Sequence, residues 1–128
     1  MNDQDIAQLL SSESEERYDF FLANLVEEKE VWILINDNNE FLKVFAQEED
    51  FEYLPVWPNI ELAKHYAKTG AGLTPKSIAL PDFIGKWVKG LKRDDLEVGI
   101  IPAPDGSIWV MSAEELKNDI QDELSNML

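Results

Sequence analysis

The sequence predicts a single α/β (α+β) domain with a central mixed sheet of about five or six strands, helices packed on it and a closing C-terminal helix. Three observations lead to this prediction. The 128 residues suffice for one ordinary core and not for two. A hydrophobic share of 45% excludes disorder over most of the length. Short β-rich runs also alternate with segments of helical periodicity. Within the domain, residues 1–11 are expected to be a loosely attached N-terminal segment.

A first helix is predicted over residues 13–28. Ser12 and Glu15 have the spacing of a capping box, in which side chains satisfy the free donors at a helix start. Apolar side chains recur at helical spacing on one face of this segment: Tyr18, Phe21, Leu22, Leu25 and Val26. Phe20 points the other way, and we expect its ring to lie under the short apolar segment 6–10.

Three strand signals follow this helix. Residues 31–35 form a continuous apolar run rich in β-branched and aromatic side chains, which is typical of a strand covered on both faces. The turn sequence Asn-Asp-Asn-Asn at 36–39 tolerates left-handed backbone, so 41–45 is expected to return as the second strand of a hairpin. Residues 51–57 are also extended in pattern, but Pro55 cannot donate a hydrogen bond to a ladder, which predicts an edge strand.

Two further helices are predicted in the middle of the chain. Pro58 suits the first turn of a helix that ends before Gly70, because its missing N–H has no partner there in any case. After a short extended piece at 76–80, Pro81 opens the next helix, and Gly90 is its expected stop. Its inward side chains are expected to be Phe83, Ile84, Trp87 and Val88.

The last third of the chain predicts a hairpin and a closing helix. Residues 97–101 and 107–111 are expected to pair antiparallel across an Asp-Gly loop. Ser112 and Glu115 have capping-box spacing. The apolar stripe of the helix that follows is narrow: Leu116, Ile120, Leu124 and Met127. Such a stripe suits a helix lying over a sheet, and a homodimer seam through the C-terminal helix would give the same pattern.

The charge is strongly negative and unevenly distributed. The chain has 26 acidic and 11 basic residues, a formal net charge of -15. Residues 1–56 carry a net charge of -12, residues 57–93 carry +5, and residues 94–128 carry -8. The overall field disfavours nucleic acid as a partner. We interpret the basic middle as internal compensation of charge. A patch for an anionic ligand or an acidic partner is the alternative.

Composition also excludes several chemistries. No cysteine is present, which excludes disulfides, thiol nucleophiles and thiolate metal sites. A single histidine excludes multi-histidine metal centres, and no acidic run has the ligand spacing of a calcium loop. We therefore expect no metal, no cofactor and no catalytic residue. The N-terminus lacks the pattern of a secretory leader, and no run reaches the roughly 20 apolar residues that cross a bilayer. A cytoplasmic location without membrane contact is expected.

A candidate interaction surface combines an aromatic corner with a basic helix. Trp57 and Pro58 form a corner between the expected edge strand and the next helix, where an aromatic ring can be presented to a partner. Lys86, Lys89 and Arg93 would share one exposed stripe if their helix continued past its expected stop. The alternative interpretation is that these cations only offset the helix dipole near a C-terminus.

A candidate pocket is expected near His65 or Lys76. His65 falls on the polar side of its helix, one turn after Glu61, so a weak surface pair between the two is the simpler interpretation. A general acid or base needs a nucleophile or substrate within reach, and the sequence indicates neither.

Several motifs occur in an order that resembles a known family. They are Glu-Arg-Tyr-Asp-Phe-Phe at 16–21, Glu-Val-Trp-Ile-Leu at 30–34, Leu-Pro-Val-Trp-Pro at 54–58, Pro-Lys-Ser-Ile-Ala-Leu at 75–80 and Val-Gly-Ile-Ile-Pro at 98–102, followed by Pro-Asp-Gly at 104–106. From about Glu16 onward, the chain resembles the bacterial "domain of unknown function 2750" family. The resemblance implies a small cytoplasmic bacterial α/β domain without established activity, and it supplies no site residues. A fainter likeness, to the serine-sensitivity-enhancing protein family, implies an interaction domain.

These observations favour a non-enzymatic interaction or regulatory module of the bacterial cytoplasm, with a protein as its partner. Two alternatives stay open. The first is a small-molecule binding domain or weak enzyme. The second is an immunity-type protein whose acidic face blocks a basic partner, although solubility alone explains the same acidity.

Overall fold

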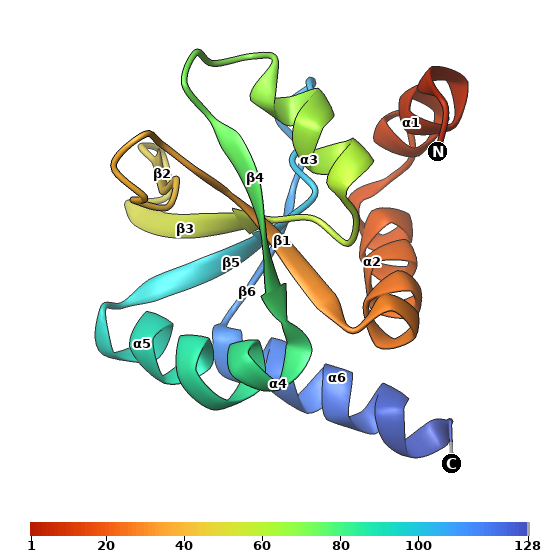
Figure 1. Cartoon of the computed structure of the whole chain (residues 1–128), viewed down its shortest axis with the longest axis vertical. Helices are drawn as coiled ribbons and strands as arrows, with labels where there is room; N and C mark the ends of the chain where they lie inside the picture. The colour runs from red at the N-terminus through yellow and green to blue at the C-terminus, as the bar shows by residue number, and fades with distance from the viewer. Residues whose placement is uncertain (128) are drawn as a thin grey trace.

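Six strands form two hydrogen-bonded sheets in a computed structural model that describes residues 1–127 (Figure 1). One sheet pairs β1 (Glu30–Ile35) antiparallel with β4 (Thr74–Ala79). The other has the order β2-β3-β5-β6. Its strands are β2 (Val44–Ala46), β3 (Phe51–Val56), β5 (Leu96–Ile100) and β6 (Trp109–Met111). The pair β3–β5 is parallel, whereas β2–β3 and β5–β6 are antiparallel. The predicted α+β class is confirmed, with the strands divided between two sheets.

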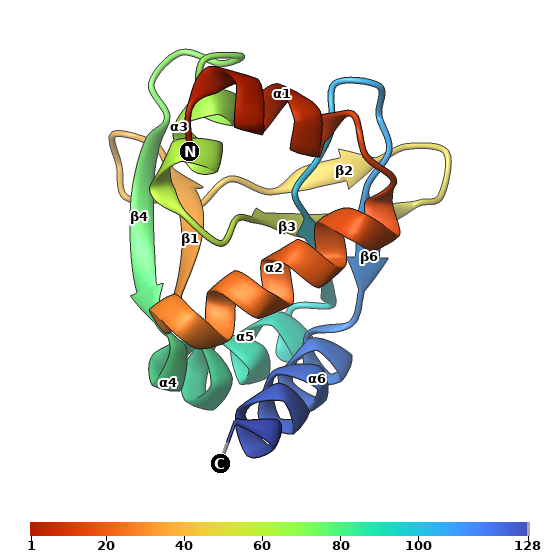
Figure 2. The same cartoon turned by 90° about the vertical axis from the view of Figure 1, so that its right-hand side faces the viewer.

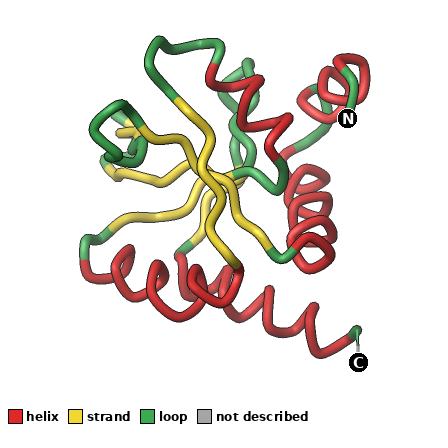
Figure 3. Tube along the Cα trace, in the orientation of Figure 1, coloured by secondary structure: helices red, strands yellow, loops and turns green. Residues whose placement is uncertain are grey.

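Two tryptophans connect the sheets. The main-chain N–H of Trp32 donates to the carbonyl of Trp57 at 2.9 Å, and the N–H of Trp57 donates back to the carbonyl of Trp32 at 2.9 Å. This reciprocal bridge joins β1 to the end of β3. As a result the strands of both sheets converge at the centre of the molecule, with the helices at its periphery (Figure 3).

The predicted hairpin between 31–35 and 41–45 is wrong beyond its turn. Asn36 donates its N–H to the carbonyl of Glu40 at 2.9 Å, so the turn itself closes as expected. Ile35 and Phe41 then form a single bridge, after which the chain leaves β1 and continues as β2 in the other sheet. Over its full length β1 pairs instead with β4, which offers six partners in register.

The predicted edge position of 51–57 is also wrong, because β3 lies between β2 and β5. Main-chain groups along a strand point alternately to the two neighbouring strands. Val56 accepts a hydrogen bond from Ile101, just after β5, and Trp57 faces β1, so the nitrogen of Pro55 is on the side away from β5. On that side, the pairing of β3 with β2 reaches only as far as Tyr53, and the bridge to β1 forms only at Trp57. Pro55 lies between these two points. The missing donor therefore breaks no ladder hydrogen bond.

Two helices open the chain, α1 (Asp3–Leu10) and α2 (Ser14–Glu28) (Figure 2). The side chain of Asn2 caps α1, which joins the core through the buried Ile6. The predicted capping box of α2 is wrong: Glu13 occupies the cap position without a side-chain hydrogen bond. Ser12 instead donates its hydroxyl to the carbonyl of Leu9 and so closes the preceding helix. Phe20 and Leu9 line one cavity between the two helices, as expected for that ring.

The closing helix α6 (Ala113–Asn126) is capped by Ser112, whose hydroxyl accepts the N–H of Glu115 at 3.1 Å. The predicted N-cap residue is therefore confirmed. α6 packs on α2 and α5, and both Leu116 and Ile120 are completely buried in the core (Figure 2). These two residues of the apolar stripe are used within the chain. They are consequently not available to a homodimer seam.

Helix α3 (Ile60–Ala67) is capped by Asn59, whose side chain accepts the N–H of Leu62 at 2.9 Å. Pro58 therefore precedes the cap, and the predicted position of Pro58 in the first turn is wrong. The helix still ends before Gly70. The Trp57–Pro58 peptide bond is trans, since none of the described residues has a cis bond.

The third helical region runs without a break from Leu80 to Arg93. It consists of α4 (Leu80–Asp82), a π-helical turn η1 (Phe83–Trp87) and α5 (Val88–Arg93). The predicted stop at Gly90 is wrong, because Gly90 has an ordinary helical backbone and Leu91 after it is buried, which holds the next turn on the core. Asp95, with φ of 58°, marks the turn into β5.

Candidate functional site

The π-helical turn shapes the surface on which the candidate site lies. Within η1 the N–H of Val88 donates to the carbonyl of Phe83, five residues earlier, so this turn is wider than an α-helical turn. Phe83 and Val88 are buried and fix the helix on the core, whereas Trp87 between them is only half-buried. Turns of this kind are rare and frequently occur at functional sites.

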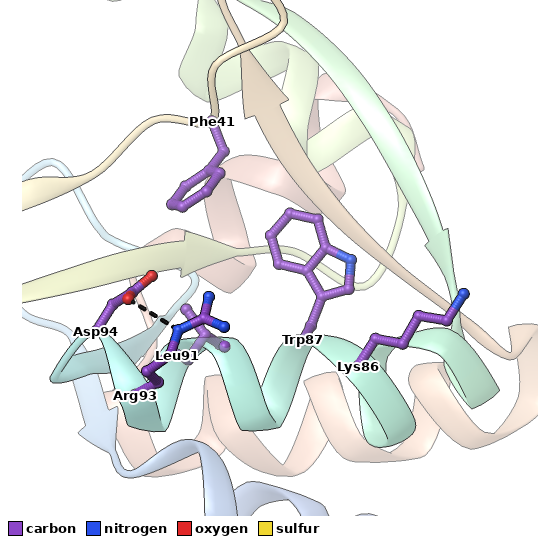
Figure 4. A pocket seen from close by; sticks show the side chains of 7 residues that line it. Phe41, Lys86, Trp87, Leu91, Arg93 and Asp94 are labelled. Carbon is purple, nitrogen blue, oxygen red and sulfur yellow. Dashed lines mark hydrogen bonds and ion pairs between the residues drawn. The ribbon is translucent and has the colours of Figure 1, made fainter.

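A groove of about 240 Å³ lies between Phe41 and the α5 region (Figure 4). Phe41 follows the turn after β1, and Trp87 comes from η1. Their rings meet edge to face with centroids 5.4 Å apart and an interplanar angle of 63°. Leu91 and Gly90 complete the apolar lining. A cavity of about 150 Å³ holds a benzene-sized group, so the groove has room for one medium-sized apolar side chain.

Cations border this groove. Because the helix passes through Gly90, Lys86, Lys89 and Arg93 follow one another at spacings of three and four residues and share a stripe, and all three are exposed. Lys86 and Arg93 line the groove directly. Asp94 also lines the groove and accepts a hydrogen bond from Nε of Arg93 at 3.3 Å, so one of the two lining cations is already paired. Among the described residues, no carboxylate lies within 4.0 Å of the ammonium groups of Lys86 or Lys89. Their charge is thus free to meet an external anion.

The aromatic corner lies in the core. Trp57 is 1% exposed, Pro58 is buried, and the indole packs against Tyr66 with ring centroids 5.1 Å apart. The reciprocal bridge to Trp32 pulls this corner inward. Trp57 and Pro58 therefore contribute almost no exposed surface. Of the expected interaction surface, only Lys86, Lys89 and Arg93 are exposed, and their role in binding stays a prediction.

The two residues of the candidate pocket lie apart. His65 lines a cavity of about 90 Å³ together with Trp57, Tyr66 and the segment 102–104. Lys76 does not line this cavity; it is exposed on β4, opposite Ile33 of β1. His65 and Lys76 therefore do not share this cavity, and a candidate pocket beside His65 stays a prediction.

Sequence reasoning missed Phe41 and the buried Arg17. Phe41 was expected in a strand, and nothing local indicates that a residue 46 positions away would face it. Arg17 is the buried charged residue of the described chain, with 0% exposure. A signal for it exists in the sequence: Arg17 precedes Phe21 and Leu25 by one and two helical turns, so it falls on the apolar face of α2.

Further features of the described residues concern metals and membranes. Within residues 1–127, no group of three or more His, Cys, Asp or Glu side chains is arranged to hold a metal ion. In the same range, none of the helices combines the length and the apolar character that crossing a bilayer requires.

Comparisons with known proteins identify a family and no individual relative. No curated protein matches the chain. A model of the family described as "protein of unknown function (DUF2750)" matches residues 18–120, a span that contains both sheets and the groove. The resemblance to this family is confirmed, and the fainter likeness to the serine-sensitivity-enhancing family stays a prediction. The chain belongs to the DUF2750 family.

Proposed function

We propose that the protein is a non-enzymatic binding module of the bacterial cytoplasm, which takes an acidic segment of a partner protein in the groove between Phe41 and α5. One observation carries this proposal: the groove has apolar residues in its lining together with Lys86 and Arg93, and Lys89 lies beside them on the same exposed stripe, within the only third of the chain with a positive net charge.

The two parts of the groove support different aspects of binding. An apolar side chain that fills the groove against Phe41, Trp87 and Leu91 leaves water, and such buried anchors supply most of the affinity at interfaces. Exposed cations mainly speed encounter and select the partner by charge. The rest of the surface carries most of the 26 acidic residues and repels an acidic segment, so binding would be confined to this site.

Small-molecule binding is the second candidate, because the groove is close in size to a ligand pocket and has both apolar and charged residues in its lining. About 240 Å³ lies just below the range of about 300–1,000 Å³ typical of ligand pockets. A small aromatic carboxylate would use the same rings and the same cations as an acidic peptide. The two candidates therefore need a test with both probes.

The test compares two fluorescent peptides in a polarisation titration. One carries Asp and Glu around a central Met, and the control carries Asn and Gln at the acidic positions. We expect only the acidic peptide to bind. Lys86→Glu/Lys89→Glu should weaken its binding at least about tenfold, while Lys64→Glu/Lys68→Glu, the same charge change on exposed residues of α3 and its cap, should leave it unchanged.

Three results would contradict the proposal. They are an absence of acidic-peptide binding, equal losses in both variants, and equal binding of the amide control. Benzoate and indole-3-acetate serve as the small-molecule probes. If either of them binds the groove and the peptide does not, the second candidate replaces the first.

A further inference from the structure

This same sequence contains an acidic segment with an exposed apolar side chain, which is the combination that the groove requires. We infer that the distal part of α6 from a second copy of the chain, with Met127 as its anchor, occupies the groove between Phe41 and α5. This inference rests on the proposed function, because it names the occupant of the same groove.

The distal part of α6 has the chemistry that the groove requires. Met127 is 59% exposed, the most exposed of the large hydrophobic side chains in the described chain. Glu123 lies four residues earlier and therefore shares a helix face with it. Glu123 and its neighbour Asp122 are both exposed, and the last turn of α6 contains no basic residue. The carbonyl end of a helix adds partial negative charge to this segment.

The two surfaces are complementary in shape and charge. Methionine is an adaptable side chain that makes favourable contacts between its sulfur and aromatic rings, and the touching rings of Phe41 and Trp87 both line the groove of about 240 Å³. With the Met127 side chain in the groove against these rings, we expect the carboxylates of Asp122 and Glu123 to face Lys86 and Arg93. An ion pair of the same kind exists within one copy, where Lys92 on α5 meets a carboxylate of α6 at 2.9 Å.

The segment cannot fill the groove of its own copy. Leu116 and Ile120 are completely buried and fix the course of α6 on the core. From that anchor the helix runs away from α5, and its C-terminal end projects from the body of the molecule (Figure 1). A second copy must therefore supply the occupant. Two copies that exchange these ends form a closed two-fold dimer in which each interaction occurs twice.

The experiment uses charge reversal on each side of the contact and sedimentation equilibrium from about 10 µM to about 1 mM, the range of weak association. Lys86→Glu/Lys89→Glu makes both the groove and the α6 end acidic. Asp122→Lys/Glu123→Lys makes both basic. Each variant alone should stay monomeric because like charges then meet, while the wild type dimerises. An equimolar mixture of the two variants should dimerise again, because both contacts become complementary.

Matched controls separate this contact from net charge. Lys64→Glu/Lys68→Glu and Glu48→Lys/Glu49→Lys change the charge by the same amounts at distant exposed positions and should dimerise like the wild type. Met127→Ser should weaken the dimer at least about tenfold, because the anchor is lost. A wild type that is monomeric throughout would overturn the inference, as would variants that dimerise alone or a mixture that does not.

The outcome is distinguishable from a failure of the proposed function. If the wild type is monomeric while the acidic peptide still binds the groove, the second copy is excluded as the occupant and the groove remains a site for another acidic segment. If neither association occurs, both proposals fail together.

Discussion

The buried guanidinium of Arg17 donates a hydrogen bond from Nε to the carbonyl of Ile101 at 3.0 Å, and Ile101 has a left-handed backbone with φ of 45°. A β-branched residue is strained in this region, so its surroundings must hold it there. The N–H of Ile101 donates to Val56 at 3.1 Å and extends the β3–β5 pairing. The other nitrogens of Arg17 donate to the carbonyls of Ser12 at 2.6 Å and Ser107 at 2.9 Å. One side chain thus joins the start of α2 to the loop after β5.

Arg17→Met should lower the free energy of unfolding by about 3 kcal/mol. Burial lowers the pKa of the Arg17 guanidinium, and the charge of Asp105 opposes this effect. Methionine fills much of the same volume but leaves the three carbonyls without their donors. Urea unfolding measures the change, and Arg93→Met on the exposed surface serves as a control with an effect below about 0.5 kcal/mol. A loss below about 1 kcal/mol for Arg17→Met would mean that Arg17 does not hold this junction together.

Tyr18 should make stability fall at high pH. Its hydroxyl donates to the carboxylate of Asp119, and its ring stacks on Trp109 with centroids 5.1 Å apart. Burial, followed by this hydrogen bond and the charge of Asp119, raises the pKa of Tyr18 above 10. An acid whose pKa is raised by folding contributes stability that is complete below its unfolded pKa, about 10, and is lost as the pH rises above it.

The measurement compares wild type with Tyr18→Phe in urea titrations between about pH 8 and pH 11, which bracket the unfolded pKa of tyrosine. Near pH 8 the variant should be less stable by about 1 kcal/mol, the value of one hydrogen bond. Above about pH 10 the difference should shrink, because only the wild type loses the tyrosine contribution. A difference that stays constant over this range would show that the Tyr18 proton is not linked to folding.

Local patterns predicted the elements better than they predicted their partners. The apolar periodicity of α2 placed Phe21 and Leu25 in the core correctly, because a helix face is defined by residues three and four apart. Strand pairing has no such local rule. Residues 41–45 follow a turn that closes a hairpin, yet they form only one bridge with β1. The strand that pairs with β1 over its full length is β4, which lies about 40 residues after β1 in the sequence. Likewise, Pro55 is compatible with an interior strand only because β2 stops short of it.

The basic part of the candidate site could be predicted from local sequence, and the aromatic part could not, for the same reason. The spacing of Lys86, Lys89 and Arg93 gave the basic stripe on the condition that the helix continue, and the packing of Leu91 on the core meets that condition. The sequence favours a surface position for Trp57 because the residue lies at a corner between an expected edge strand and the next helix. Its burial depends on a hydrogen-bond bridge to a strand distant in sequence, which no local pattern contains.

Gly90→Ala should stabilise the fold and weaken binding at the groove. Gly90 lies inside a helix with an ordinary backbone, where alanine is favoured by about 0.5–1 kcal/mol. An added Cβ would have Arg93 Nη2 as its nearest neighbour, at 3.8 Å, which is ordinary contact. Because Gly90 also lines the groove, the methyl group narrows the space for an apolar anchor. Thermal unfolding and peptide titration measure the two effects. A lower melting temperature would contradict the helical role of Gly90.

Added salt should raise the melting temperature of the monomer. The described residues form three ion pairs, Met1–Glu61, Lys92–Glu114 and Arg93–Asp94, and the acidic partner of each is largely exposed. These pairs offset little of a net charge of -15, so repulsion among carboxylates remains the larger electrostatic effect. At physiological ionic strength, charges more than about 8 Å apart are largely screened.

The melting temperature is measured in sodium chloride from low to physiological concentration, because specific salt effects on apolar burial are small in this range. The protein is kept dilute so that unfolding of the monomer is observed. Glu48→Gln/Glu49→Gln removes two exposed charges from an acidic run and should show a smaller increase with salt than the wild type. A melting temperature that stays constant or falls with added salt would mean that local attraction, centred on the basic segment 57–93, outweighs the repulsion in this fold.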